Sequence, residues 1–291
     1  MIVVLGDVMV DVVARLSGPV AVGSDSAARV SWGSGGSAAN VAAWLVTAGV
    51  ERPAVVARVG DDPQGAAARE QLATAGVDVR LAVDGERSTG TCIVLVAPSG
   101  ERSMLPDAGA NDALRPDDLQ DELLVAGDHL HVAGYALLRD GSREAARGAI
   151  ARARAAGMSV SVDPSSAALL SAEFLDLAAG ADLLLPNLDE AAALTGESEP
   201  AKAARVLAQG FPEVVVKLGA EGALWTDGKE EARVPAPPAP RLLDTTGAGD
   251  AFAAGLLAAR TLGAQPREAL KAACALAAEA VATRGARPTH A

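Results

Sequence analysis

The sequence has few aromatic residues and few cysteines. Only 2% of its 291 residues are aromatic whereas 50% are hydrophobic, so the core must be built from alanine, valine and leucine. Cys92 and Cys274 lie far apart in apolar runs, which favours two buried free thiols over a disulfide. No uninterrupted apolar stretch is long enough to span a bilayer.

Positive charge is also scarce. With 25 Lys+Arg against 37 Asp+Glu, the formal net charge is −12, which argues against a nucleic-acid or anionic-membrane surface. A nucleotide ligand is not excluded, because backbone N–H groups bind an anion without net positive charge. Residues 1–7 lack a basic leader and predict a strand rather than a signal peptide, so we expect a cytoplasmic protein.

Short apolar runs alternate with alanine-rich helical stretches along most of the chain. Strands are expected at residues 2–5, 54–59, 129–132, 159–162, 183–185 and 214–217. Helices are expected at 38–48, 65–75, 142–156, 189–195, 201–209, 251–262 and 266–283. This alternation predicts a single α/β domain over residues 1–291, with a mainly parallel central sheet flanked by helices on both faces.

Two stretches depart from this alternation. Residues 12–32 and 79–104 alternate apolar and polar side chains with glycine and proline between them, a pattern typical of exposed antiparallel strands. Within the second stretch, residues 91–104 predict a hairpin with a Pro-Ser-Gly turn. The proline-rich residues 234–240 predict an extended connector.

The run Asp-Thr-Thr-Gly-Ala-Gly-Asp at residues 244–250 precedes an apolar helix. A glycine-rich turn that opens a helix presents free N–H groups and the positive end of the helix dipole, which suits phosphate. Asp250 would repel that phosphate unless it had a role there, and accepting a proton from an attacking hydroxyl is such a role. The alternative is an acidic cap on an ordinary helix.

Two other pairs of polar residues each allow a functional and a structural interpretation. Asn187 and Glu190 lie three positions apart at a helix start, where they are either ligands on one face or a dipole-stabilising first turn. His129 and His131 share one face of a strand, but without an evident third ligand we interpret them as structural.

Two other classes of nucleotide-binding protein fit the sequence less well. Residues 33–38 match Gly-x-Gly-x-x-Ala, as in an NAD(P)-binding oxidoreductase, but the preceding run is half polar and Glu51 does not end a second strand. A P-loop is excluded because Lys229 is followed by Glu230 rather than Ser or Thr.

Six motifs together resemble the ribokinase-like (PfkB) carbohydrate kinases, in the order that the family has them. They occupy residues 35–40, 59–65, 108–111, 186–190, 217–222 and 244–250, and so cover almost the whole chain. The resemblance implies a ribokinase-like fold in which residues 12–32 and 79–104 form a small β-sheet lid over the sugar. In the family this lid often serves as a homodimer contact.

The resemblance also implies an activity and a set of site residues. An ATP-dependent kinase would transfer the γ-phosphoryl group to a hydroxyl of a small sugar, namely a pentose, a ketohexose or a sugar acid. A nucleoside acceptor of the adenosine type is the alternative. Asp250 would be the general base, with Gly247, Ala248 and Gly249 as the anion hole. The sugar would contact Asp11, Gly35, Gly36, Asn40 and Asn111.

The nucleotide and its ions are assigned by the same resemblance. ATP would contact Asn187, Lys217, Gly219, Gly222 and Cys274, and Mg²⁺ would be held through water by Asn187 and Glu190. A K⁺ site would be formed by Asp244, Thr246, Ala280, Thr283, Gly285 and Thr289.

Two departures from ribokinases bear on the acceptor. Residues 131–135 lack the carboxylate that helps ribokinases to hold ribose, and Met9 replaces a polar residue. Few basic residues surround the acceptor motifs, which disfavours a phosphorylated acceptor because such acceptors usually need Arg or Lys.

Overall fold

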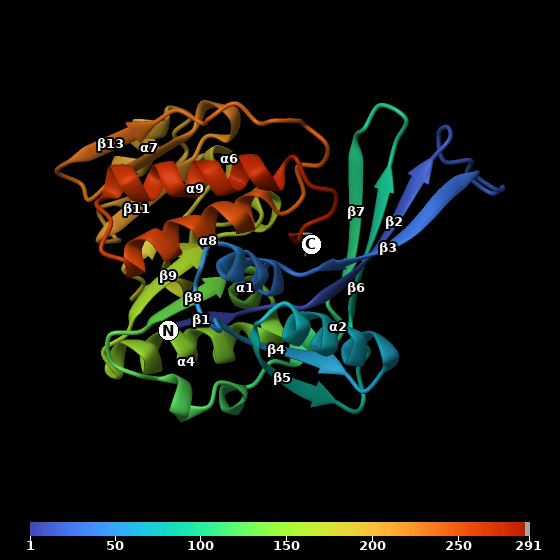
Figure 1. Ribbon diagram of the computed structural model, residues 1–291, viewed down its shortest axis with the longest axis horizontal. Helices are drawn as coiled ribbons and strands as arrows, with labels where there is room; N and C mark the ends of the chain where they lie inside the picture. The colour runs from blue at the N-terminus through green and yellow to red at the C-terminus, as the bar shows by residue number, and fades with distance from the viewer. Residues whose placement is uncertain (289–291) are drawn as a thin grey trace.

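The computed structural model describes residues 1–288 and contains a large and a small β-sheet (Figure 1). The large sheet has nine strands in the order β13-β12-β11-β10-β9-β8-β1-β4-β5. Its strands are β1 (Ile2–Leu5), β4 (Ala54–Gly60), β5 (Asp78–Asp84), β8 (His129–Ala133), β9 (Ser159–Asp163), β10 (Leu183–Leu184), β11 (Glu213–Lys217), β12 (Ala223–Thr226) and β13 (Glu231–Val234). The pairs from β5 to β11 are parallel and the last two are antiparallel, which confirms the mainly parallel sheet.

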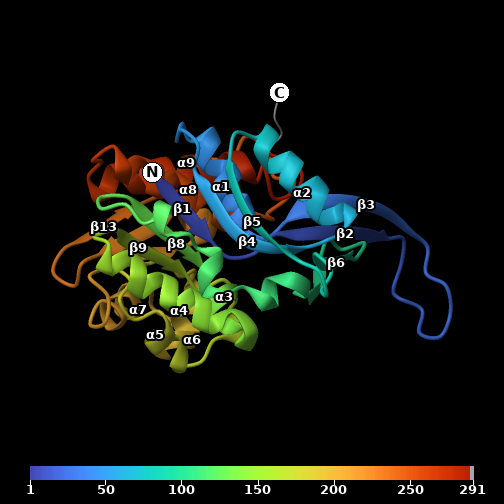
Figure 2. The same cartoon turned by 90° about the horizontal axis from the view of Figure 1, so that it is seen from below.

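Helices cover both faces of the large sheet (Figure 2). They are α1 (Ser37–Thr47), α2 (Pro63–Thr74), α3 (Tyr135–Leu138), α4 (Asp140–Ala155), α5 (Glu173–Leu177), α6 (Leu188–Thr195), α7 (Pro200–Leu207), α8 (Ala248–Thr261) and α9 (Pro266–Ala280). Short 3₁₀ helices lie at Gly109–Ala113, Pro116–Asp118, Asp121–Leu123, Ala167–Leu169 and Gly219–Glu221. Helices α1, α2, α8 and α9 share one core with the sheet, and α4 to α7 share the other.

Both cores consist mainly of alanine, valine and leucine, as the composition predicts. The small side chains let the helices approach closely, because an alanine keeps neighbouring backbones nearer than a larger side chain does. No helix among residues 1–288 is both long and apolar enough to cross a membrane.

The small sheet projects from one end of the large one and has the order β3-β2-β6-β7 (Figure 1). Its strands are β2 (Met9–Leu16), β3 (Ala28–Gly35), β6 (Gly90–Val96) and β7 (Arg102–Asp107). The predicted hairpin is confirmed, since β6 and β7 pair antiparallel, whereas β2 and β6 pair parallel.

The sequence-based boundaries of the small sheet were partly wrong. Residues 79–84 belong to β5 of the large sheet, and the small sheet starts at Met9 and extends to Asp107. The error has a physical cause: β5 is an edge strand with one solvent-facing side, so its polar and apolar residues alternate as they do in the small sheet.

The junction between the two sheets is held by tight backbone contacts. Asn111 is buried, and its Nδ2 donates to the carbonyls of Val8 (2.9 Å) and Ala108 (3.0 Å) while its Oδ1 accepts the Val8 N–H (3.0 Å). Gly36, which caps α1 with φ +90°, passes so close that an added Cβ would lie 2.5 Å from the Asp7 carbonyl oxygen. These contacts fix the amino end of α1 next to the small sheet, since β3 ends at Gly35 and α1 begins at Ser37.

Candidate active site

The loop before α8 forms a helix amino end with unoccupied donors. Gly247 caps the helix with φ +79°, and an added Cβ would lie 2.3 Å from the carbonyl oxygen of Ala286, so only glycine fits. Within residues 1–288, no acceptor takes the backbone N–H of Gly247, Gly249 or Asp250. These donors and the helix dipole make the loop suitable for an anion, as the sequence predicts.

Asp250 lies at this helix end and faces the amino end of α1. Ser37 Oγ donates to its Oδ1 (2.7 Å), and Asn40 Nδ2 donates to its Oδ2 (2.9 Å). Burial, with smaller contributions from Asp163 and Asp7, raises the pKa of Asp250 to about 7 against the lowering effect of the two hydrogen bonds. A carboxylate with this pKa takes up a proton near neutral pH.

A lysine approaches the same loop from β11. Lys217 Nζ donates to Asp163 Oδ2 at 2.5 Å, and an added Cβ on Gly249 would lie 3.7 Å from that nitrogen. Burial disfavours the ammonium charge, but Asp163 and Glu190 outweigh it and raise the pKa of Lys217. A charged ammonium group therefore lies beside Gly247–Gly249, the candidate anion-binding turn.

Asn187 and Glu190 are brought together at the start of α6. The Asn187 N–H donates to Glu190 Oε2 and the Glu190 N–H donates to Asn187 Oδ1, both at 2.8 Å, so the pair forms a reciprocal helix cap. Glu190 is buried, and this burial raises its pKa although Lys217 opposes the rise. Within residues 1–288 no group of three or more His, Cys, Asp or Glu could hold a metal, so the pair is not part of an all-protein metal site.

Three of the residues expected to bind ATP lie in different surroundings. Gly219 (φ +58°) has open space where a Cβ would be, whereas a Cβ on Gly222 would lie 2.0 Å from the carbonyl oxygen of Val234. A side chain at position 222 would therefore clash with the end of β13, so glycine is needed where β12 begins. Cys274 is buried on α9 within the helix core, where burial raises its pKa to about 11. Gly219 alone of these three presents an open backbone.

The acceptor-side residues converge on an arginine that the sequence analysis missed. Arg287 Nε donates to Asn40 Oδ1 (3.1 Å), and its Nη2 donates to the Gly35 carbonyl (2.7 Å). This contact fixes the Asn40 amide with its Nδ2 toward Asp250. Burial raises the pKa of Asp11 to about 6, and Arg287 opposes the rise. Asp11 also lies against Gly35, where an added Cβ would be 2.3 Å from its Oδ1.

Asn111 does not converge on this group. Both of its amide hydrogens are used by backbone carbonyls at the sheet junction, and the expected sugar contact stays a prediction. The sequence pattern identifies a recognisable motif there, but it does not distinguish a side chain that binds a ligand from one that holds a turn.

A second arginine outside the expected motifs lies near Asp7. Arg139 Nη2 is 3.9 Å from Asp7 Oδ2, and its guanidinium is 5.3 Å from the centre of the Tyr135 ring. Burial, with Asp7 and Asp250, raises the pKa of Tyr135 to about 12. The expectation that few basic residues surround the acceptor region is therefore wrong, because Arg139 and Arg287 both lie there.

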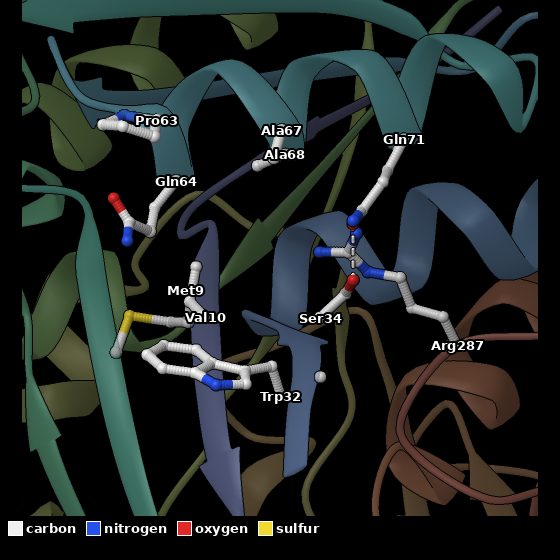
Figure 3. Close-up of a pocket in the computed structure, with 11 residues that line it drawn as sticks. Met9, Val10, Trp32, Ser34, Pro63, Gln64, Ala67, Ala68, Gln71 and Arg287 are labelled. Atoms are coloured by element: carbon white, nitrogen blue, oxygen red, sulfur yellow. Dashed lines mark hydrogen bonds between the residues drawn. The ribbon is translucent and has the colours of Figure 1, made fainter.

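A cavity of about 290 Å³ opens between the small sheet and α2 (Figure 3). Met9 and Trp32 supply an apolar wall, and Ser34 donates to Gln71 Oε1 across it at 2.6 Å. Its lining residues are Met9, Val10, Trp32, Gly33, Ser34, Pro63, Gln64, Ala67, Ala68, Gln71 and Arg287. Because Arg287 also bonds Asn40, the cavity adjoins the Asp250 group.

The residues expected to bind K⁺ are partly assembled around Asp244. The Thr246 N–H (3.0 Å) and Arg102 Nη2 (2.7 Å) donate to its Oδ1, and the Gly285 N–H (3.3 Å) donates to its Oδ2. The carbonyl of Ala280 accepts the Thr283 N–H at 2.9 Å in the turn after α9. Thr289 lies outside the described residues.

Comparison with known proteins identifies relatives that match most of the chain. The profile described as "pfkB family carbohydrate kinase" matches residues 1–290. The chain is 34% identical over 282 residues to an ATP-dependent ribose-1-phosphate kinase of Halopiger xanaduensis, covering 92% of this chain and 87% of that protein. It is 33% identical over 270 residues to a fructokinase of Klebsiella pneumoniae, covering 88% and 82%.

Solved structures of similar proteins agree with the family match. The adenosine kinase of Sinorhizobium meliloti superposes with a TM-score of 0.89 at 28% identity, covering 99% of this chain and 95% of that one. A putative ribokinase II from E. coli, solved in complex with ATP and Mg²⁺, superposes with a TM-score of 0.86 at 26% identity, covering 98% and 94%. These likenesses confirm the ribokinase-like fold that the sequence motifs predict.

The raised pKa of Asp250 predicts a stability effect. The folded state keeps an extra proton between the ordinary Asp value of 3.8 and about 7, so Asp250 lowers stability as pH rises through this window. In Asp250→Asn, the new amide could still accept from Asn40 Nδ2 and donate to Ser37 Oγ. We expect this variant to equal the wild type near pH 4 and to raise the free energy of unfolding by on the order of 2 kcal/mol at pH 8, allowing for partial solvation.

Urea unfolding at both pH values measures this difference. Asp140→Asn makes the same chemical change on the exposed start of α4 and is the matched control, for which we expect no gain between pH 4 and pH 8. An Asp250→Asn difference that is the same at both pH values would contradict the raised pKa.

Proposed function

The chain belongs to the pfkB family of carbohydrate kinases, and from this premise we propose that Asp250 is the general base of its phosphoryl transfer. The enzyme is a phosphotransferase with an alcohol group as acceptor. The observation that carries the proposal is the position of the Asp250 carboxylate: it lies at the amino end of α8, beside N–H groups that no acceptor within residues 1–288 takes.

The proposed reaction joins an acceptor hydroxyl to the γ-phosphoryl group of ATP. The hydroxyl oxygen forms the new bond to phosphorus while the bond to the β-phosphate oxygen breaks, and Asp250 takes the hydroxyl proton. The N–H groups of Gly247 and Gly249 stabilise the negative charge on the transferred group, whereas that of Ala248 donates to the Thr245 carbonyl at 3.4 Å. The ammonium group of Lys217 adds to this stabilisation. Its place beside Gly249 supports this role for Lys217.

The residues around Asn187 and Glu190 fit a Mg²⁺ ion that arrives with ATP. A protein cage of three carboxylates or histidines is not present within residues 1–288, and Mg²⁺ usually keeps several waters and uses few protein ligands. Glu190, through its remaining carboxylate oxygen, would orient such waters. The ion would neutralise phosphate charge during the transfer.

The acceptor that we propose is a small sugar. Asp11, Asn40 and the Gly35–Gly36 backbone would contact its hydroxyls, and their convergence around Arg287 supports this. A nucleoside acceptor is the second candidate, supported by the cavity in which Trp32 and Met9 lie opposite Gln64 and Gln71 (Figure 3). A planar base suits an apolar wall with amide groups across from it. Since the reaction consumes ATP, we place the enzyme in the cytoplasm.

Measuring ADP formation from ATP and Mg²⁺ over a panel of acceptors tests the function. The panel holds ribose, ribose 1-phosphate, fructose, 2-dehydro-3-deoxygluconate and adenosine. We expect one acceptor to be preferred and Asp250→Asn to lower kcat with it about 10²- to 10⁴-fold, which is the usual contribution of a general base. Asp140→Asn should retain full activity. A near-wild-type rate in Asp250→Asn would remove Asp250 from the reaction, and background rates with every acceptor would refute the acceptor class.

We also propose that the enzyme is a homodimer that pairs through the exposed apolar face of the small sheet, on which Trp32 also borders the cavity described above. Trp32, Ile93 and Leu105 form one row across that face, since Val12 pairs with Trp32 and Ile93, and Ile93 pairs with Leu105. All three of these side chains are exposed, with exposed fractions of 68%, 44% and 52%. An exposed apolar row of this kind is typical of a protein interface.

Sedimentation equilibrium tests the dimer. We expect the wild type to have twice the mass of one chain and Ile93→Glu to shift toward the monomer, because a buried charge without a partner destabilises an interface. Val206→Glu, on exposed helix α7 away from the small sheet, is the control that should remain dimeric. A monomeric wild type at micromolar concentration would refute the proposal.

A further inference from the structure

An arginine of the small sheet reaches the loop that precedes the anion-binding turn. Arg102 is the first residue of β7, and its side chain is 25% exposed. Its Nη2 donates to Asp244 Oδ1 at 2.7 Å, and its Nη1 donates to Thr246 Oγ1. The two contacts join segments of the chain that are 142 residues apart. The residues that Arg102 contacts directly precede Gly247 in the sequence.

The Asp244 carboxylate already has a positively charged partner and two backbone hydrogen-bond donors. Its carboxylate is buried and receives Arg102, the Thr246 N–H and the Gly285 N–H. Burial alone would raise its pKa, but the Thr246 contacts, Arg102 and the Gly285 N–H together lower it. Asp244 therefore stays ionised with a guanidinium as its counter-ion.

These contacts do not fit the K⁺ site that the family resemblance implies. K⁺ takes oxygen ligands, and Arg102 already donates to both the Asp244 carboxylate and the Thr246 hydroxyl, the two side-chain oxygens that this loop would offer. A cation bound at Asp244 would also lie against the guanidinium, and two like charges at such a distance repel strongly in a buried place.

We propose that the Arg102 guanidinium is the permanent cation of this site, so that the enzyme needs no monovalent cation. The same contact makes Arg102 a positioning residue, because it holds Asp244 and Thr246 in the conformation from which Gly247 opens the helix. The small sheet is thereby coupled to the anion-binding turn. The catalytic part of this inference depends on the proposed kinase function, whereas the cation-binding part does not.

Melting temperature in K⁺ and in tetramethylammonium chloride of equal ionic strength tests the cation-binding part without any substrate. Tetramethylammonium is too large to replace K⁺ at Asp244, so it controls for ionic strength alone. We expect the wild type to melt at the same temperature in both salts. Arg102→Ala should melt about 2 °C or more higher in K⁺, because a cation bound only to the folded state stabilises it. Arg29→Ala removes an exposed arginine of the same sheet and should behave as the wild type.

Kinase activity in the same two salts tests the positioning role. Arg102→Ala should lose about 10- to 100-fold in kcat/KM, as expected for a lost charge-assisted hydrogen-bond pair, and K⁺ but not tetramethylammonium should restore part of it. Arg102→Lys, which keeps the charge but not the forked geometry, should retain more activity than Arg102→Ala and should show no K⁺ effect.

Two results would overturn the inference. One is a wild type that melts higher in K⁺ or requires K⁺ for activity, because the site would then hold a cation beside Arg102. The other is an Arg102→Ala variant that is folded and unaffected by K⁺ in melting, because no cation site would then have been vacated. If the wild type phosphorylates no acceptor, the kinase proposal fails while the melting comparison still decides the cation question.

Discussion

The partly buried Asp250 carboxylate lies at the amino end of α8, and helix α1 supplies the hydrogen-bond donors that stabilise its ionised form. Ser37 and Asn40 approach from the amino end of α1, so the amino ends of α1 and α8 face each other across this carboxylate. The two helices share one core with the large sheet, and their small side chains allow the close approach that this geometry requires. The pKa near 7 follows from burial opposed by only these two hydrogen bonds.

Residues 281–288 hold helix α1 and the turn before α8 in position. The Ala286 carbonyl accepts the Trp44 Nε1–H of α1 at 2.9 Å, and it also lies where a side chain on Gly247 would be. Arg287, the next residue, orients the Asn40 amide. One short segment therefore sets the position of α1, the shape of the turn before α8 and the direction of a hydrogen bond to Asp250, although it contains none of the six sequence motifs.

The sequence predicts the parts of this site whose chemistry is local. Asp250, the glycines before it and the pair Asn187 and Glu190 are visible because each sits at a turn that opens a helix. The donors and counter-ions are not visible in this way. Ser37, Arg102, Asp163 and Arg287 acquire their roles from contacts between distant segments. Conversely, Asn111, Gly222 and Cys274 stand in recognisable motifs or positions but serve packing and backbone contacts.

The pH dependence of kcat/KM for the preferred acceptor at saturating ATP and Mg²⁺ tests the central claim most directly. If Asp250 is the base, the wild-type profile should rise with an apparent pKa near 7 and then level. In Asn40→Ala this apparent pKa should move higher, because the ionised carboxylate loses a hydrogen bond while its burial remains. A profile that is flat from pH 5 to pH 9, or a rise that Asn40→Ala leaves in place, would contradict the account.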